Sequence, residues 1–281
     1  MKRSKFLLSM LAFGYAFMYV PLFCVIGFSF NGSKFVTTWS HFSFKWYHTL
    51  AQNRIMLDAT LNSLKIACCT ATVSVVLGAL AAIAIVRFKR FSGKSFFIGM
   101  IAAPLIMPDV VTGLSLLLLF IGMNNLFGWP GEHGSMTVTI AHITLSLSYV
   151  TAIIQSRLAE IDSSIEEAAL DLGATPTKVF FVITIPAISS AIISGWVLSF
   201  VLSFDDVVLA SFVSGPQSTT LPMVVFSSIR MGLSPQINAL TTIIIGVLTV
   251  CVAIAGYIIY HSSKRIPQKS KGEGKHWRSL V

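Results

Sequence analysis

The sequence predicts an all-α integral membrane protein with six transmembrane helices, and three observations support that fold class. Of the 281 residues, 54% are hydrophobic and only 11% are charged, whereas about 25% are charged in an ordinary soluble domain. The mean hydropathy is +0.79. The apolar residues are gathered into long blocks, several of which reach the roughly 20 helical residues needed to cross a bilayer core of about 30 Å.

The first apolar block covers residues 6–28 and is longer than the apolar region of a cleaved signal peptide. We therefore expect an uncleaved first span, with a kink at Pro21. Residues 30–60 are polar and aromatic, which favours an outer loop with a short interfacial helix. The other spans are expected at residues 61–86, 96–122, 136–154, 179–204 and 239–260.

Two further features complete the description of the chain. Glycine and proline interrupt residues 211–235, where we expect a loop or a re-entrant segment. The four cysteines lie in apolar blocks without zinc-ligand spacing or a disulfide framework, and no other metal-ligand pattern is visible. We interpret them as small buried hydrophobic residues: Cys24, Cys68, Cys69 and Cys251.

The basic residues predict the orientation of the spans. The net charge of +9 could favour nucleic acid as a partner, but the charges lie between and beyond the apolar blocks. With the N-terminus inside, the inner segments hold 15 lysines and arginines and the outer segments hold four. This asymmetry indicates that both termini lie in the cytoplasm. Because the charges stand where they can orient the spans, we expect no nucleic-acid partner.

The inner segment 157–178 differs from the other connecting segments because it carries five of the eleven acidic residues. Ser163 with Glu166, or Ser164 with Glu167, fits a capping box that begins a short helix. Small alanines in that helix would allow a partner to approach closely, and the acids could meet basic groups. The residues alone leave two readings open, a docking surface for a cytoplasmic protein and an ordinary polar connector.

The end of this segment predicts a sharp turn and a second helix. Gly173 is placed to end the first helix in the left-handed conformation. Thr175 fits the N-cap of a second helix whose first residue is Pro176.

The same segment resembles the signature of binding-protein-dependent ABC importer permeases of type I, also called MetI-like. Glu167-Ala168-Ala169, then Gly173, then Ile183 and Pro186 follow the family spacing of EAA, three residues, G, nine residues, I, one residue and LP. Ile185 replaces the expected leucine. The resemblance implies a permease core over residues 60–256, one additional span in residues 1–59, and a cytoplasmic basic tail over residues 257–281.

The resemblance also implies that this segment couples the chain to a cytoplasmic ATPase. The coupling residues would be Glu166, Glu167, Ala168, Ala169, Gly173 and Pro186. No G-x-x-x-x-G-K-[ST] phosphate loop is present, so we expect a non-catalytic subunit without a cofactor, with ATP and Mg bound by the partner. The implied assembly lies in the bacterial inner membrane and contains two permease subunits, forming a heterodimer, an ATPase dimer and a periplasmic binding protein.

Three acidic residues lie within or beside the expected spans. Asp109 falls inside the third, and Asp205 and Asp206 stand at the outer end of the fifth. A carboxylate at a helix centre costs about 2.5–3.5 kcal/mol, so such groups usually face a cavity or a partner. They could present negative charge to a cationic substrate, or they could cap helices.

The stretches around these acids resemble bacterial polyamine permeases, and in particular one of the two membrane subunits of the putrescine importer. They are residues 107–115, 203–208, 214–216 and 219–223. Because putrescine is a dication, the resemblance implies that Asp109, Asp205 and Asp206 line its pathway. A periplasmic polyamine-binding protein would then deliver the substrate.

Two aromatic residues after the first span, Trp46 and Tyr47, could also meet an amine through cation–π contacts. Anchoring at the membrane interface is the alternative. For His142, we expect a hydrogen bond between helices.

Two other functions remain open. The first is an ABC importer for another small solute, such as spermidine, iron, thiamine or sulfate. The second is a transporter driven by an ion gradient, which would need neither an ATPase nor the signature in segment 157–178. An intramembrane enzyme is disfavoured because no G-x-S-x-G nucleophile elbow is present.

Overall fold

The computed structural model describes residues 5–35, 38–88, 90–231 and 234–263. These residues form helices and connecting segments, with one isolated bridge between Asn31 and Phe42. The chain divides into two compact units, residues 53–232 and a smaller unit made of residues 1–52 and 233–281. Most of the expected basic tail, residues 264–281, lies outside the described residues.

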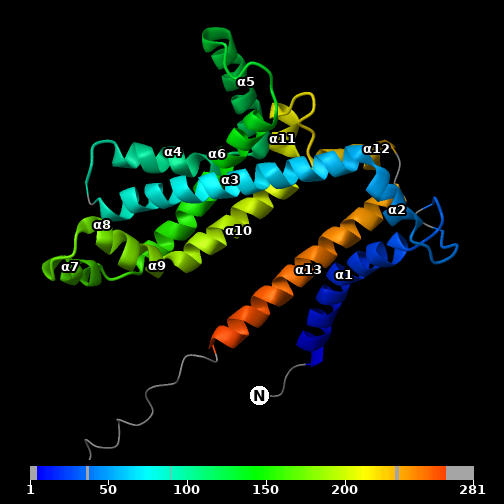
Figure 1. The fold of residues 1–281 in the computed structure, drawn as a ribbon, viewed down its shortest axis with the longest axis horizontal. Coiled ribbons are helices and arrows are strands. Elements are labelled where there is room, and N and C mark those ends of the chain that lie inside the picture. Colours follow the sequence, from blue (N-terminus) through cyan, green and yellow to red (C-terminus); the bar gives the residue numbers. More distant parts are fainter. Residues whose placement is uncertain (1–4, 36–37, 89, 232–233, 264–281) are drawn as a thin grey trace, which may run out of the picture. The chain divides into compact units, whose positions relative to one another are not determined.

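The smaller unit contains three helices: α1 (Lys5–Ser29), α2 (Lys45–Gln52) and α13 (Pro235–Ser263). α13 packs against α1 and α2 (Figure 1). The expected first span and the short helix after it are both confirmed. The side chains of α1 are almost entirely exposed and apolar, as suits a helix in contact with lipid.

The larger unit is built around α3 (Arg54–Arg87), α6 (Ser135–Ala159) and α10 (Ser189–Asp205), each of which packs against the other two. Small residues allow the close approach. A Cβ atom at Gly78 would lie 2.8 Å from the Val150 side chain, and one at Gly195 would lie 3.3 Å from it. Membrane helices that lack a hydrophobic driving force between them associate through such close contacts.

The expected third span is wrong as a single helix. The chain breaks at Met107 and Pro108 into α4 (Lys94–Ile106) and α5 (Asp109–Phe127). A proline disfavours helical conformation in the residue before it, and Met107 is extended. α4 packs against α6, whereas α5 packs mainly against α11 (Val208–Val213) (Figure 1).

The expected fifth span is also broken. The chain forms α8 (Pro176–Val179), a π-helix η1 (Phe180–Thr184) and α9 (Ile185–Ala187) before α10 begins. The helical segments before and after Ile188 are bent by 64° relative to each other. π-Helical turns and prolines are the usual causes of such bends, and Pro186 lies two residues after the end of η1.

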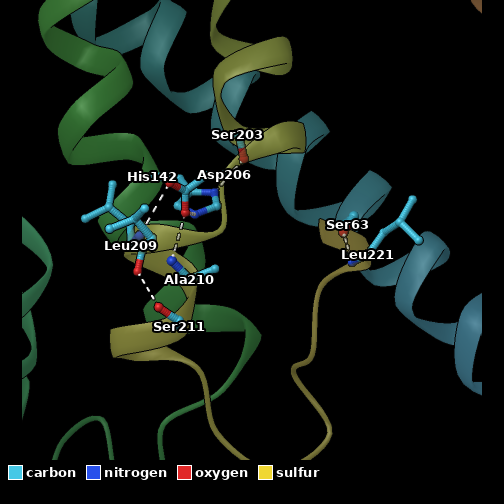
Figure 2. Close-up of polar contacts among 9 residues, drawn as sticks. Ser63, His142, Ser203, Asp206, Leu209, Ala210, Ser211 and Leu221 are labelled. Atoms are coloured by element: carbon cyan, nitrogen blue, oxygen red, sulfur yellow. Dashed lines mark hydrogen bonds and ion pairs between the residues drawn. The ribbon is translucent and has the colours of Figure 1, made fainter. Parts of the chain in front are cut away.

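In the described part of residues 211–235, where we expected a loop or a re-entrant segment, the chain forms helix as well as turn. α11 and α12 (Leu221–Met231) enclose a turn. The Ser63 hydroxyl of α3 accepts a hydrogen bond from the Leu221 main-chain N–H at 2.7 Å (Figure 2). The Thr137 hydroxyl of α6 donates to the main-chain carbonyl of Val213 at 2.7 Å. These bonds fasten the segment to the two longest core helices.

The described residues contain four helices long and apolar enough to cross a membrane, or five if the bent pair is one span. The helical membrane fold is therefore confirmed, and the count of six spans stays a prediction. α3 begins at Arg54, before the expected residue 61. The interpretation of the cysteines as buried is wrong for Cys24, Cys68 and Cys69, which are exposed thiols on helices α1 and α3; Cys251 lies outside the described side chains.

Candidate functional site

The expected coupling segment folds into a short helix, α7 (Ser163–Asp171). The expected capping box is wrong, because Asp162 is the N-cap and its Oδ1 accepts the main-chain N–H of Ser164 at 2.9 Å. Aspartate caps a helix at least as well as serine. The N-cap is therefore Asp162, one residue before the first expected N-cap, Ser163. The Ser164 main-chain N–H holds the pKa of the Asp162 carboxyl below its usual value.

The turn after α7 agrees with the sequence. Gly173 has a φ of 85°. The Ala174 N–H donates to the Ala169 carbonyl at 3.0 Å and the Gly173 N–H donates to the Leu170 carbonyl at 2.9 Å, which is the Schellman pattern. α8 then begins at Pro176 with Thr175 as its N-cap, as predicted.

The two adjacent glutamates of α7 occupy different environments. Glu166 Oε1 accepts hydrogen bonds from Arg87 Nη2 at 2.6 Å and from the Thr184 hydroxyl at 2.8 Å. The Glu166 side chain is only 16% exposed. Glu167 and Ala168 are exposed, and Ala169 is half-buried. Only Glu167 is therefore positioned to meet another protein with its carboxylate.

The apolar side chains of α7 and its turn are largely uncovered within this chain. Leu172 is 90% exposed and Ile165 is 54% exposed. An exposed apolar surface next to exposed acids is typical of a protein interface. Pro186 lies outside the α7–α8 hairpin, in α9 beside the 64° bend, so it shapes the connection to α10.

At the other end of α10, which is about 25 Å long, Asp206 is held within the protein. Its carboxylate accepts the main-chain N–H groups of Leu209 at 3.4 Å and Ala210 at 2.8 Å, which caps α11. Oδ2 also lies 3.2 Å from Nε2 of His142 on α6 (Figure 2). The Nδ1 atom of His142 lies 2.7 Å from the Ser203 hydroxyl, so the expected hydrogen bond between helices is confirmed.

The neighbouring Asp205 and the more distant Asp109 are both exposed. Asp205 is the last residue of α10, and Asp109 is the first residue of α5, with Pro108 at the N-cap position. A carboxylate in the first turn of a helix is stabilised by the helix dipole. Gly113, one turn after Asp109, lies against Phe212 and Leu209 of α11. The start of α5 therefore packs on α11, the helix that follows Asp205 and Asp206 in the chain.

Trp46 and Tyr47 belong to the smaller unit, and Tyr47 lies in a cluster of aromatic rings with Phe30 and Phe44. Trp46 is 7% exposed, and its indole N–H donates to the Asn31 carbonyl at 2.7 Å. The Tyr47 hydroxyl lies 2.7 Å from the Ser29 hydroxyl. The ring centroids of Phe30 and Tyr47 are 5.3 Å apart. These bonds show that both side chains are held by neighbouring residues of the smaller unit; contact with an amine and anchoring at the membrane interface both stay predictions.

Sequence reasoning missed Arg87 and Thr184 as partners of Glu166. Arg87 was counted only as a charge that orients α3, and 79 residues separate it from Glu166. Nothing in the local pattern identifies such a pair, although a glutamate directly before the EAA signature and a basic residue at a span end were both visible.

The sequence matches one protein family along most of its length. The family described as "binding-protein-dependent transport system inner membrane component" matches residues 74–267. The putrescine transport system permease protein PotI of Escherichia coli (strain K12) is 52% identical over 263 residues, 94% of each chain. The spermidine/putrescine transport system permease protein PotC of the same strain is 40% identical over 87% of this chain and 90% of that protein.

Solved structures share the fold at low sequence identity. One chain of the bacterial alginate ABC transporter, bound to its alginate pentasaccharide-loaded periplasmic protein, has a TM-score of 0.69 at 16% identity over 95% of both chains. One chain of the inward-facing MetNI methionine ABC transporter has a TM-score of 0.54 at 13% identity. The family match covers most of the chain, the relatives cover nearly all of it, and the fold agrees, so this chain belongs to the family of binding-protein-dependent transport system inner membrane components, the permease subunits of ATP-driven importers.

Proposed function

We propose that this chain is one permease subunit of a putrescine importer in the bacterial inner membrane. The single observation that carries the proposal is the 52% identity to a putrescine permease along 94% of both chains. The aligned region is long enough to include the helices that carry Asp109 and Asp205 as well as the α7–α8 hairpin. Permeases of this family are non-catalytic and act with an ATPase and a substrate-binding protein.

The α7–α8 hairpin is the ATPase-coupling element in this proposal. Glu167 and Ala168 face outward, Leu172 adds an exposed apolar anchor, and the left-handed Gly173 fixes the turn between the two helices. Pro186 and the π-helix then carry the motion of the hairpin into α10 through the bend. ATP and Mg bind the partner ATPase dimer.

The substrate pathway uses the exposed carboxylates. Asp205 and Asp109 offer negative charge to a diamine at the ends of α10 and α5. Asp206 acts as a positioning residue, because its oxygens already bind His142 and the start of α11. Trp46 and Tyr47 hold the segment between α1 and α2 in place.

The charge distribution supports an orientation with both termini and α7 in the cytoplasm. The Asp205 end of α10 then opens towards the periplasm, where a polyamine-binding protein delivers the cargo. The second permease subunit is a related chain, which gives a heterodimer.

The test is uptake of radiolabelled putrescine by cells that lack this chain and are complemented with wild type or Asp205→Asn. We expect the wild type to restore uptake and the variant to reduce it at least fivefold at unchanged protein level. Uptake of putrescine at the same rate with and without this chain would contradict the proposal.

A second cargo, spermidine, is favoured by the 40% identity to a spermidine/putrescine permease. A competition experiment distinguishes a putrescine importer from an importer that carries both polyamines. Excess unlabelled spermidine leaves putrescine uptake unchanged if putrescine is the preferred cargo, and abolishes it if the two polyamines share the pathway equally.

A further inference from the structure

The Glu166 carboxylate joins α7 to the helices of the larger unit. Glu166 lies on α7, one residue before the exposed Glu167, and its Oε1 atom is shared by two donors. Arg87, the last residue of α3, approaches Oε1 at 2.6 Å, and the hydroxyl of Thr184, the last residue of η1, approaches it at 2.8 Å. One carboxylate oxygen therefore joins three elements of the larger unit.

The environment of this carboxylate strengthens the connection. The Arg87 and Glu166 side chains are only 21% and 16% exposed, and charged hydrogen bonds that are shielded from water are stronger and better oriented than exposed ones. A cavity of about 200 Å³ beside them is lined by both residues, by Leu170 of α7 and by Thr184. The Arg87–Glu166 ion pair thus lies at a hollow that α7, α3 and η1 line together.

The positions of the two donors are informative. Arg87 is at the end of α3, the 34-residue helix that packs along both α6 and α10. Thr184 is at the end of the π-helix that precedes the 64° bend. A displacement of α7 would therefore pull on the largest core helix and on the base of α10 at the same time.

We propose that Arg87, Glu166 and Thr184 form a latch that transmits the movement of α7 to α3 and α10. The three are positioning residues: Glu167 and its neighbours meet the partner, and the latch relays the resulting motion into the bundle. The inference rests on the proposed docking of an ATPase on α7. It extends that proposal by giving the two adjacent glutamates different roles: Glu167 binds the ATPase, and Glu166 transmits the movement of α7.

The experiment uses the complete importer in proteoliposomes, with Arg87→Ala and Glu166→Gln in this chain. Putrescine uptake and ATP hydrolysis are measured together. We expect the ATPase to copurify in normal amount and basal hydrolysis to continue, while uptake per ATP hydrolysed falls about tenfold. The paired reversal Arg87→Glu with Glu166→Arg should restore at least a third of that ratio, since it re-forms the ion pair.

The matched control is Glu160→Gln, which removes another ion pair of the same hairpin region. Arg157 and Glu160 lie 2.9 Å apart, but their side chains are 46% and 64% exposed and join no second helix. We expect its uptake ratio to stay within twofold of wild type. An unchanged ratio in both latch variants, or loss of the ATPase from both, would overturn the proposal.

A second readout does not depend on the cargo. Hydrogen–deuterium exchange of the wild-type complex should change on ATP binding in both α7 and the last two turns of α3. In Arg87→Ala the response of α7 should persist and that of α3 should disappear. If the wild-type complex moves no putrescine but shows the paired response, the proposed cargo fails and the latch stands; if α3 responds equally in the variant, the latch fails.

Discussion

The larger unit carries two pairs of adjacent acids, and the structure divides both pairs in the same way. Glu166 is bound by Arg87 and Thr184, whereas Glu167 is exposed. Asp206 is bound by His142 and two main-chain N–H groups, whereas Asp205 is exposed. In each pair one carboxylate binds other residues of the chain, and its neighbour is available to a partner. In our proposal the partner of Glu167 is the ATPase, and the partner of Asp205 is the cationic substrate.

The two pairs differ in what surrounds them. The Glu166–Glu167 pair lies on a nine-residue helix with exposed apolar side chains, a surface suited to another protein. The Asp205–Asp206 pair lies between two helices, and His142 beside it is 2% exposed. The first site therefore offers an exposed surface to a partner, which in our proposal is the ATPase, and the second keeps one carboxylate fixed beside an exposed one.

The largest expected effect comes from reversing the charge of the exposed glutamate. Glu167→Arg places a cation where we expect basic groups of the ATPase, so putrescine uptake should fall by at least tenfold. The measurement is putrescine uptake in cells with membrane level checked by immunoblot. Asp171→Arg, at the exposed end of the same helix, should reduce uptake less, and equal loss from both would remove the special role of Glu167.

The second effect separates Asp206 from Asp205. Asp206→Ala leaves His142 and two main-chain N–H groups without their acceptor, and each buried unsatisfied group costs about 1–3 kcal/mol. We expect a loss of about 3 kcal/mol of stability, seen as a lower midpoint of thermal unfolding in detergent. Asp205→Ala should keep that midpoint and lose uptake. If only Asp205→Ala lowered the midpoint of thermal unfolding, Asp205 and not Asp206 would be the residue that stabilises the protein.

A smaller effect is expected at the turn after α7. Gly173 has a φ of 85°, and a side chain in this left-handed conformation costs roughly 1–2 kcal/mol. Gly173→Ala should therefore speed amide exchange in α7 at least fivefold. The control is Gly99→Ala, whose added Cβ meets nothing within 4 Å in α4. Unchanged exchange in Gly173→Ala would show that the turn tolerates the strain.

The smallest effect is expected at the N-cap of α7. Asn caps a helix about as well as Asp, so Asp162→Asn should leave uptake within twofold, whereas Asp162→Ala should fray the first turn in amide exchange. Because the pKa of Asp162 is lowered, the wild-type cap is intact above the ordinary carboxylate pKa and is lost as the pH falls through the folded value. Equal exchange in the Ala and Asn variants would argue against the cap.

The hydrophobic blocks predicted the helices because apolar length alone determines which segments can cross a bilayer. Breaks within helices were harder to predict. The prolines at 108 and 186 were visible, yet a proline in a membrane helix can be tolerated when neighbouring groups satisfy the backbone. Whether each one ends or bends a helix depends on packing that the sequence does not display.

The turn after α7 and the start of α8 were predictable because their signals are local: Gly173, Thr175 and Pro176 act on residues next to them in the chain. The roles of Glu166 and Asp206 were not, because their partners Arg87 and His142 lie 79 and 64 residues away. A pair of adjacent acids looks symmetrical in sequence, and only tertiary contacts reveal which member is already bound.

The most direct test of the account is putrescine uptake by proteoliposomes that contain the complete importer, with ATP supplied only on the side that α7 faces. We predict ATP-dependent accumulation in the wild type. In Glu167→Arg, accumulation should be lost while this chain remains inserted at a normal level. Accumulation of putrescine without ATP, or at the wild-type rate in Glu167→Arg, would contradict it.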